Sequence, residues 1–555
     1  MKLRSVVSFS STGALALAVF VACGSSKDRT VFDDPDATPV GFGDGGNFEG
    51  GEGGGNIGGR DPVNCSEAAL FKTYVGCDYW PTVTANPVQE VFDFAVAVAN
   101  VGSETANVTV TGPNGVNEKI SVGGGQLGKV YLPWVKSLKG PQVALTTGAI
   151  TAMTASVFEA GGAYHLVSDK PVVVYQFNAL EFKAAGGKPG KDWSSCKKPL
   201  GVTAPDCYSY SNDASLLLPS TAMTGNYRVM GSTGWSTGLQ NLTPPALTIT
   251  GTAADTSVSI KLTAAGQVVA GGAITATAGG GTLTFKLGAG DVAEVIGGVG
   301  SAFDFSGSLI KADKPVQVIS GTQCINMPAD VAACDHIEET QFPAETLGKH
   351  YVVTRPTGPK ANDVGQVVRF YGNVDGTVLT YTPSKPAGCP DFLNAGQVAQ
   401  CTGTGIVAVD FEVAGDKEFG VGMFMLGGQL ADPNSSSAAQ PQGDPSLSFA
   451  VTVEQYRKRY VFLAPTDYIT SYVDIVAASG TTLTLDGADV SGKLKSLTGT
   501  SWLIARILLG PGKDGAHVLE GSAPIGIQVM GYGDNTSYQY PGGLNLSAIS
   551  AVPVK

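Results

Sequence analysis

Charged residues are scarce in this chain, and basic residues are fewer than acidic ones. Lys, Arg, Asp and Glu make up 15% of its 555 residues, well below the value of about a quarter that is typical of soluble proteins. The formal net charge is −12, and no cluster of Lys and Arg stands out. Because tight nucleic-acid binding depends on such clusters, the sequence argues against a nucleic-acid partner.

Long apolar runs are missing after the first residues of the chain. No later stretch offers the roughly 18 apolar residues that a membrane-spanning helix needs. Residues 1–22 begin with Lys2 and Arg4, continue with an apolar run and end in small residues. This layout predicts a secretory signal peptide.

Cys23 follows Phe20, Val21 and Ala22, which resemble a bacterial lipobox, although leucine is usual where Phe20 stands. The match predicts a lipoprotein whose Cys23 carries fatty acids such as palmitate and becomes the mature N-terminus. An ordinary signal peptide with a chance cysteine is the alternative. Gly24 stands where an aspartate would signal retention in the inner membrane. We therefore expect the lipid to anchor the chain in the bacterial outer membrane, facing the cell surface.

The CxxC spacing of zinc ribbons is absent as well. Of the nine cysteines, the eight beyond Cys23 fall into close pairs. Eight cysteines allow 105 connectivities, but the clustering favours local disulfides, as expected of an exported protein. Each bridge is expected to stabilise the fold by roughly 3 kcal/mol. The expected pairs are Cys65 with Cys77, Cys196 with Cys207, Cys324 with Cys334, and Cys389 with Cys401.

The rest of the chain divides into a tether and a β-rich body. Residues 23–64 are rich in Gly and Asp and poor in apolar residues, which predicts a disordered tether. Later runs such as "FDFAVAVAN" and "TSVSIKL" alternate apolar and polar residues, as short antiparallel strands do. We predict an all-β fold of about four tandem β-sandwich-like units, with a closed propeller-like ring as the alternative. The predicted units are residues 65–182, 208–322, 337–427 and 447–550.

A repeated segment marks these units. It reads "SDKPVVVYQF" from Ser168, "ADKPVQVISG" from Ala312, "GDKEFGVGMF" from Gly415 and "GSAPIGIQVM" from Gly521. Its proline, where present, is expected at the first residue of a strand, where the missing N–H costs no ladder hydrogen bond.

The segment "CINMPADVAACDHIEET", residues 324–340, contains residue types that bind metals and move protons. Asp335, His336, Glu338 and Glu339 are minor candidates for an ion or a partner contact. The counterpart at residues 196–219 also has a cysteine pair before a proline, but no histidine. We therefore interpret the segment as a disulfide-closed loop that holds no metal. This interpretation predicts that His336→Ala changes the free energy of unfolding by no more than about 1 kcal/mol.

Sequence signs of catalysis are weak. "GWSTG", residues 234–238, matches the GxSxG pattern around Ser236, but that pattern needs a following helix, and Pro244 and Pro245 come too soon for one. HExxH and P-loop patterns are absent. His165 and His350 lie in strand-like runs, where a histidine is usually structural. We expect no catalytic residue and no cofactor.

Residues 333–353, "ACDHIEETQFPAETLGKHYVV", resemble the Cys-Asp-His-Leu-Glu-Glu-Gln-x-Pro-Pro segment of the IgGFc-binding protein N-terminal domain family. Ile337 replaces the leucine, Thr340 precedes Gln341, and Phe342 stands before Pro343. "DKPVVVYQF" and "SYQYPGGLNL" fit the same family, and residues 75–100 resemble the opening of bacterial lipoproteins that carry this domain. The resemblance covers essentially all of 63–550. Its motifs are structural, so it implies the fold more strongly than the function, and no catalytic residues come with it.

Two functions are compatible with these observations. The first is a surface-exposed, non-catalytic binding or adhesion protein whose partner is an unknown protein or glycan. The second is an envelope hydrolase or glycan-active enzyme. A deep pocket surrounded by His336, Glu338 and Glu339 would favour the enzyme, whereas dispersed carboxylates and a shallow loop surface would favour binding.

Overall fold

The structure is a computed structural model that describes residues 60–199, 207–237, 240–332, 334–402, 405–435, 440–513 and 515–553. In these residues the chain is nearly all β, as predicted. The α-helices are short and lie outside the sheets: α1 (Cys65–Phe71), α2 (Lys136–Lys139) and α3 (Gly428–Ala431). Asn64 caps α1, because its side chain accepts a hydrogen bond from the backbone N–H of Glu67.

The first sheet has seven strands, in the order β4-β3-β7-β2-β5, with β1 and β8 also paired to β7. Strand β2 is buried along its whole length, so both faces of the sheet are covered there. Strand β3 alternates buried and more exposed residues, so one face of the sheet is accessible to solvent at β3. The strands are β1 (Gly76–Tyr79), β2 (Phe94–Asn100), β3 (Ala106–Gly112), β4 (Val116–Val122), β5 (Leu127–Leu132), β7 (His165–Asn178) and β8 (Asp213–Leu216).

Two sheets follow that pack face to face as a sandwich. Their orders are β18-β17-β12-β15-β6 and β14-β13-β16-β9. Apolar residues of both sheets, including Ile249, Ile260 and Val318, form one buried core between them. The strands are β6 (Val157–Glu159), β9 (Asn226–Arg228), β12 (Pro245–Gly251), β13 (Thr256–Lys261), β14 (Thr282–Leu287), β15 (Val292–Ile296), β16 (Leu309–Ala312), β17 (Val316–Ile325) and β18 (Asp335–Thr340); β10 (Trp235–Thr237) and β11 (Gln240–Thr243) form a separate hairpin.

A second sandwich has the orders β19-β24-β21-β22 and β23-β20-β25-β26. Its own core includes Phe370, Phe411 and Val421. The sandwich-like form predicted for the repeats is therefore present in both middle parts of the chain. The strands are β19 (His350–Val353), β20 (Val367–Gly372), β21 (Thr377–Thr382), β22 (Phe392–Leu393), β23 (Val398–Gln400), β24 (Phe411–Gly415), β25 (Phe419–Phe424) and β26 (Leu447–Phe449).

The last sheet has eight strands, in the order β30-β29-β33-β28-β32-β31, with β27 and β34 also paired to β33. Strand β33 is 18 residues long and holds this sheet together, as β7 does in the first one. The strands are β27 (Arg457–Leu463), β28 (Thr470–Ala478), β29 (Leu483–Leu485), β30 (Ala488–Asp489), β31 (Lys495–Ser496), β32 (Trp502–Leu508), β33 (Ala516–Gly533) and β34 (Thr536–Pro541).

The repeated segment lies within one long strand in two of the sheets, β7 and β33, and spans a break between two strands in each sandwich. Pro315 precedes the first residue of β17, and Pro171 and Pro524 lie inside β7 and β33, so none of the three prolines is the first residue of a strand, contrary to the prediction. At Pro171 and Pro524 the pairing with the neighbouring strand, β1 or β27, changes register. A proline has no N–H to donate, so it fits an irregular pairing of this kind. The long strands continue through the irregularity and join two layers into one sheet.

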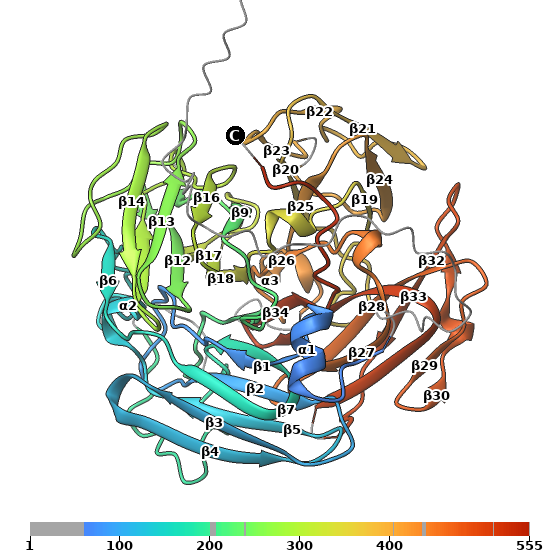
Figure 1. The fold of residues 1–555 in the computed structure, drawn as a ribbon, viewed down its shortest axis with the longest axis horizontal. Helices are drawn as coiled ribbons and strands as arrows, with labels where there is room; N and C mark the ends of the chain where they lie inside the picture. The colour runs from blue at the N-terminus through green and yellow to red at the C-terminus, as the bar shows by residue number, and fades with distance from the viewer. Residues whose placement is uncertain are drawn as a thin grey trace, which may run out of the picture. The chain divides into compact units, whose positions relative to one another are not determined.

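Four short strands are paired to the larger sheets and contact one another. They are β8, β18, β26 and β34, and each pairs with the long strand that precedes it: β7, β17, β25 or β33. β8 contacts β18 and β34, and β26 contacts the same two strands, so the contacts form a closed circuit. We call β8, β18, β26 and β34 the inner strands. Figure 1 shows β18, β26 and β34 near the middle of the view, with the larger sheets around them.

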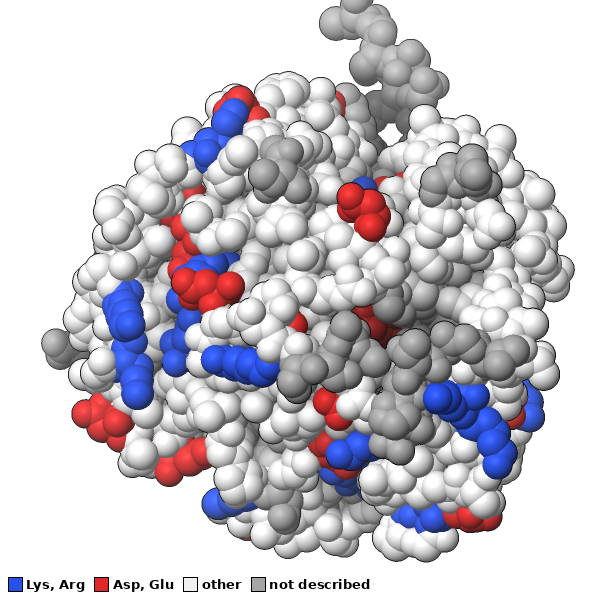
Figure 2. All heavy atoms as spheres, turned by 180° about the vertical axis from the view of Figure 1, so that it is seen from behind, with Lys and Arg blue, Asp and Glu red and all other residues white. Residues whose placement is uncertain are grey.

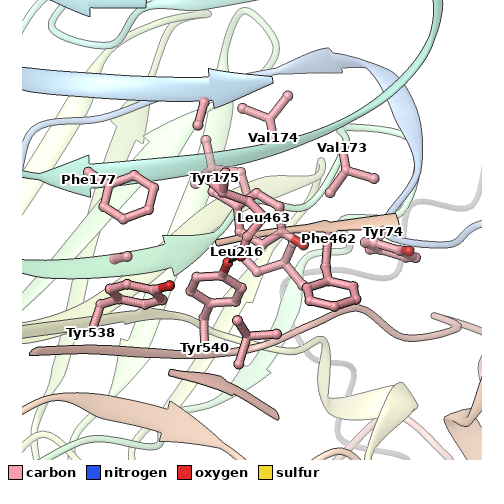
Figure 3. Close-up of a cluster of buried hydrophobic side chains, with 14 of the residues drawn as sticks. Tyr74, Val173, Val174, Tyr175, Phe177, Leu216, Phe462, Leu463, Tyr538 and Tyr540 are labelled. Carbon is pink, nitrogen blue, oxygen red and sulfur yellow. Dashed lines mark hydrogen bonds between the residues drawn. The ribbon is translucent and has the colours of Figure 1, made fainter. Parts of the chain in front are cut away.

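The first and last described segments pair with each other. Thr73 forms a β-bridge with Asn545, and the N–H of Tyr74 donates to the carbonyl of Leu544. Beside this bridge, buried aromatic rings of β7 pack on rings of β34, with Tyr175 and Tyr540 at a centroid distance of 4.5 Å (Figure 3). The start of the body therefore packs on its end.

Pairing also crosses the boundaries that we predicted for the units. β6 lies in predicted unit 65–182 but pairs with β15 of the next unit. β8 lies in predicted unit 208–322 but pairs with β7. The division into four units at those boundaries stays a prediction.

Candidate functional site

Strand β18 contains the acidic and histidine residues that the sequence singled out, and the fold encloses them all. Asp335, His336, Glu338 and Glu339 are each 0% exposed. Successive side chains of a strand point to opposite faces. Asp335 and Glu339 therefore share one face, and His336 and Glu338 share the other.

Glu338 is the centre of a buried hydrogen-bond network. Its Oε1 accepts from Gln176 Nε2 at 2.8 Å and from Ser215 Oγ at 3.1 Å, and its Oε2 accepts from Thr84 Oγ1 at 2.5 Å. Burial alone raises the pKa of Glu338. The hydrogen bond and charge of His336, with the bonds from Thr84 and Gln176, more than offset burial, so this pKa lies below its usual value. A carboxylate with so many donors is stabilised in its ionised form.

His336 links this network to the backbone of β17. Its Nδ1 lies 3.0 Å from the carbonyl oxygen of Thr322, which can only accept, so Nδ1 carries a hydrogen. Its Nε2 lies 3.4 Å from Glu338 Oε2 and 3.2 Å from Asn178 Nδ2. An imidazole beside a carboxylate and a hydroxyl can in principle move protons. Here both groups are sealed by protein, so the arrangement serves to hold β18 against β7 and β17.

The other face of β18 meets Asp213, the first residue of β8. Asp213 Oδ2 accepts from the backbone N–H of Glu338 at 3.0 Å and of Leu447 at 3.1 Å. Its Oδ1 accepts from Ser446 Oγ at 2.6 Å and from the N–H of Ala214 at 2.9 Å. One carboxyl group thus ties the inner strands β8, β18 and β26 together.

The four minor candidates for an ion contact do not come together. They are divided between the two faces of β18, with His336 and Glu338 on one face and Asp335 and Glu339 on the other. Among the described residues, no group of three or more His, Cys, Asp or Glu side chains is placed to hold a metal ion.

The structure contains the four local disulfides expected from the cysteine spacing. The pair nearest the candidate residues joins the end of β17 to the start of β18, with Cα atoms 5.3 Å apart. This pair closes the loop in residues 324–340, as the interpretation of that segment as a disulfide-closed loop predicts. The bridges are Cys65–Cys77, Cys196–Cys207, Cys324–Cys334 and Cys389–Cys401.

The remaining histidines and the GxSxG serine occupy structural positions. His165 lies 2.7 Å from Asp78 and His350 lies 2.5 Å from Glu412, in each case across paired strands. Ser236 lies in β10, and the next described element is the strand β11, so the nucleophile-elbow geometry of strand then helix is absent from this part of the described chain.

Two surface pockets that described residues line lie away from β18. The 90–161 pocket, of about 730 Å³, is lined by residues that include Glu90, Asn114, Trp134, Lys136, Ser137 and Glu159. The 228–397 pocket, of about 430 Å³, is lined by residues that include Arg228, Lys261, Thr263, Asn394 and Gln397. Neither His336 nor Glu338 lines either pocket. These two pockets and the buried polar network are thus spatially separate.

Charge on the surface is sparse. Figure 2 shows a face on which Lys, Arg, Asp and Glu form small separate groups on a background of other residues. In the described part of the chain many charged side chains form ion pairs, such as Lys136 with Glu90 at 2.8 Å. This face has no broad basic field of the kind that nucleic-acid binding requires.

Comparison with known proteins now identifies the family. A sequence model of the family described as "IgGFc binding protein" matches residues 213–531. That span begins with β8 and ends within β33, so it includes β18 with Glu338, and β26, whereas Thr84 and Gln176 of the buried network precede it. The chain belongs to the IgGFc-binding protein family. The family resemblance of the β18 segment is therefore confirmed.

A human relative, "IgGFc-binding protein" from Homo sapiens, is 26% identical over 357 residues. The aligned part is 61% of this chain and 6% of the human protein, so the chain spans only a small part of that IgGFc-binding relative. Two solved structures align weakly. An anti-sigma factor domain-containing protein from Clostridium clariflavum has 12% identity and a TM-score of 0.10, with 56% of this chain and 81% of that chain covered. A tetra-tandem repeat from the extending region of a large adhesion protein has 14% identity and a TM-score of 0.08, with 84% and 99% covered.

The predicted signal peptide, Cys23 and most of the tether lie outside the described residues. Within the described part, no helix has the length and apolar character needed to cross a membrane. Residues 60–64 fall in the predicted tether but are described and make contacts. Asp61 pairs with Arg457 Nη2 at 2.7 Å and also with Arg459.

The sequence did not reveal the partners of β18. Thr84, Gln176 and Ser215 are polar residues that no sequence motif marks. They are far from Glu338 in the chain, and folding brings them into contact with it. A signal did exist for two acidic residues. Asp213 and Asp444 stand at or just before an inner strand, as Asp335 does, so an alignment of these strand starts would have grouped them.

Proposed function

We propose that this chain is a non-catalytic binding protein of the bacterial cell surface, whose β body contacts a protein partner. The observation that carries the proposal is the family match over residues 213–531, because the family is one of binding proteins. The distribution of polar groups supports it. The residues most suited to acid–base chemistry, His336 and Glu338, are enclosed, and the accessible pockets hold neither of them.

Anchoring through Cys23 forms part of the proposal. A lipid on Cys23 would hold the body at the outer membrane, and the Gly- and Asp-rich stretch up to residue 59 would separate body from lipid. The four disulfides support an oxidising compartment outside the cytoplasm.

The 228–397 pocket is the first surface to test, because every residue that lines it falls inside the family-matched span. A photo-crosslinking amino acid at Gln397 of the full chain would sample this pocket on intact cells. Matched positions are Ser137 in the 90–161 pocket and the exposed Lys495 of β31. We expect a discrete protein adduct from Gln397 and none from Lys495.

Adducts of equal yield from all three positions, or from none, would contradict specific binding at this surface. The alternative of an envelope hydrolase or glycan-active enzyme makes a different prediction. In that case Glu338→Gln would abolish turnover of an envelope glycan in a chain that keeps its melting temperature. Absence of turnover in the wild type agrees with the binding protein, whereas turnover that Glu338→Gln leaves unchanged would place catalysis at another residue and contradict it.

A further inference from the structure

The inner strands meet at a group of enclosed carboxyl groups. Asp213 occupies the middle of this junction, and its two oxygens accept the bonds from β8, β18 and β26 described above. Each of its two carboxyl oxygens accepts two hydrogen bonds, so Asp213 is satisfied as an acceptor. The inference concerns the two carboxyl groups beside it.

Asp335 and Asp444 are enclosed at the same junction but are not satisfied. Asp335 Oδ1 accepts from the N–H of Asn212 at 2.6 Å, which places Asp335 next to Asp213. Asp444 lies two residues before Ser446, and its backbone is hydrogen-bonded to Ser537. Asp335 is 0% exposed and Asp444 is 3% exposed. Asp335 Oδ2 and Asp444 Oδ1 have no hydrogen-bond partner among the described residues.

No described basic side chain compensates these two groups. None of the ion pairs in the described part of the chain includes Asp335 or Asp444. The titratable neighbours are acidic or phenolic: Asp213 on β8, Glu338 and Glu339 on β18, Asp467 and Tyr468 before β28, and Tyr538 on β34. His336 is the exception, and it points to the opposite face of β18. The hydroxyl of the buried Tyr468 also lacks a described partner.

The electrostatic balance at this junction favours neutral acids. Burial raises the pKa of Asp335 well above its usual value, and the charges of Asp444 and Asp213 raise it further. Burial likewise raises the pKa of Asp444. Ionised carboxylates in a dry junction without a cation would repel each other, and a proton on one of them reduces this repulsion and adds an O–H donor to the junction.

We propose that Asp335 or Asp444 holds a proton inside the junction of the inner strands, where both carboxyl groups are enclosed and each has an oxygen without a described partner. At a pH above the usual pKa of a carboxyl group, the folded body then still holds a proton that the unfolded chain has released. Protonation at one of these two residues therefore stabilises the contact between β18 and β26, and acidic pH favours it. This inference does not depend on the identity of any surface partner.

The sign of the pH dependence follows from proton linkage. A carboxyl group whose pKa is raised on folding contributes most stability below its unfolded value. That contribution is lost as the pH rises from the unfolded value, near 4, toward the folded value. The two enclosed carboxyl groups therefore make the wild type less stable at pH 8 than at pH 5, and an amide at either position removes this part of the slope.

The test is the melting temperature of the full chain and of Asp335→Asn and Asp444→Asn at pH 5 and pH 8. An asparagine amide can donate where the proposed proton lies. We expect each variant to melt at least about 3 °C above the wild type at pH 8, and the difference to shrink at pH 5. The matched control is Asp304→Asn, because Asp304 pairs with Arg369 Nη2 at 2.5 Å and its variant should melt below the wild type at pH 8.

A second readout covers the case in which a variant folds poorly. The infrared spectrum of the folded wild type at neutral pH should contain the carbonyl band of a buried carboxylic acid that denaturant removes, and the band should be weaker in whichever of Asp335→Asn and Asp444→Asn folds. Variants that melt below the wild type at both pH values, with a wild type whose melting temperature a chelator lowers, would overturn the proposal in favour of a bound cation. Absence of the infrared band, or an unchanged pH slope in both variants, would also overturn it.

Discussion

The carboxylate of Asp213 accepts a 2.6 Å hydrogen bond from the hydroxyl of Ser446, although 233 residues separate the two in the chain. The same carboxylate also receives the N–H groups of Glu338 and Leu447. It lies at the point where three inner strands meet. The three sheets that contain β7, β17 and β25 are therefore connected through a single enclosed side chain, in addition to their apolar cores.

Removal of this hub should destabilise the fold strongly. Asp213→Ala leaves several buried donors without an acceptor, and we expect it to lower the free energy of unfolding by roughly 3–5 kcal/mol. Ser446→Ala removes only one of those donors and should cost about 1 kcal/mol. Denaturant unfolding of both variants measures the difference. Equal losses would show that Asp213 is not the hub.

The disulfide beside β18 should contribute as an ordinary loop closure. Cys324→Ser with Cys334→Ser should lower the free energy of unfolding by roughly 2–4 kcal/mol. Cys389→Ser with Cys401→Ser is the matched control, because the sequence separations, 10 and 12 residues, are similar. Denaturant unfolding should therefore give similar losses for the two double variants. A loss for the first pair several times that for the second would indicate a role beyond loop closure.

Asp61 should be required for the start of the body to pack on its end. The Arg457 side chain is 0% exposed, so Asp61→Ala leaves a buried guanidinium without its carboxylate. We expect a loss of roughly 2–4 kcal/mol and faster hydrogen exchange at residues 72–74. Glu67→Ala is the control, because its pair with Arg60 is exposed and should contribute little. Unchanged exchange at 72–74 in Asp61→Ala would contradict the role of this ion pair.

Cys23→Ser should release the chain from the membrane or leave an unprocessed precursor. Metabolic labelling with a radioactive fatty acid measures this directly, since the lipid is expected on Cys23 alone. The double variant Cys389→Ser with Cys401→Ser should keep its label. Full labelling of Cys23→Ser would refute the lipid anchor.

The sequence was sufficient for the fold class and for the cysteine pairs, because both depend on local patterns. Alternation of apolar and polar residues is a property of a single strand, and the disulfides join cysteines 10 to 12 residues apart. The positions of Pro171 and Pro524 could not be predicted in the same way. Both lie at register changes inside long strands, and register depends on the partner strand.

The surroundings of β18 were beyond reach of local patterns for the same reason. Glu338 contacts Gln176, 162 residues away in the chain, and Thr84, 254 residues away. Contacts between residues so far apart leave no local pattern in the sequence. The expectation that His336→Ala would change stability by no more than about 1 kcal/mol assumed that His336 in the disulfide-closed loop has only local hydrogen bonds to lose. The imidazole is instead enclosed and bonded to Thr322, so we now expect a larger loss.

The most direct test of the structural role of β18 is the unfolding free energy of His336→Ala and the wild type, each with and without a chelator. The buried imidazole bonds to the backbone of β17 and to Glu338, so its removal should lower stability by roughly 2–4 kcal/mol. The chelator should change neither protein. A wild type that the chelator destabilises, with no such effect in His336→Ala, would contradict the account and show that Asp335, His336, Glu338 and Glu339 belong to an ion site.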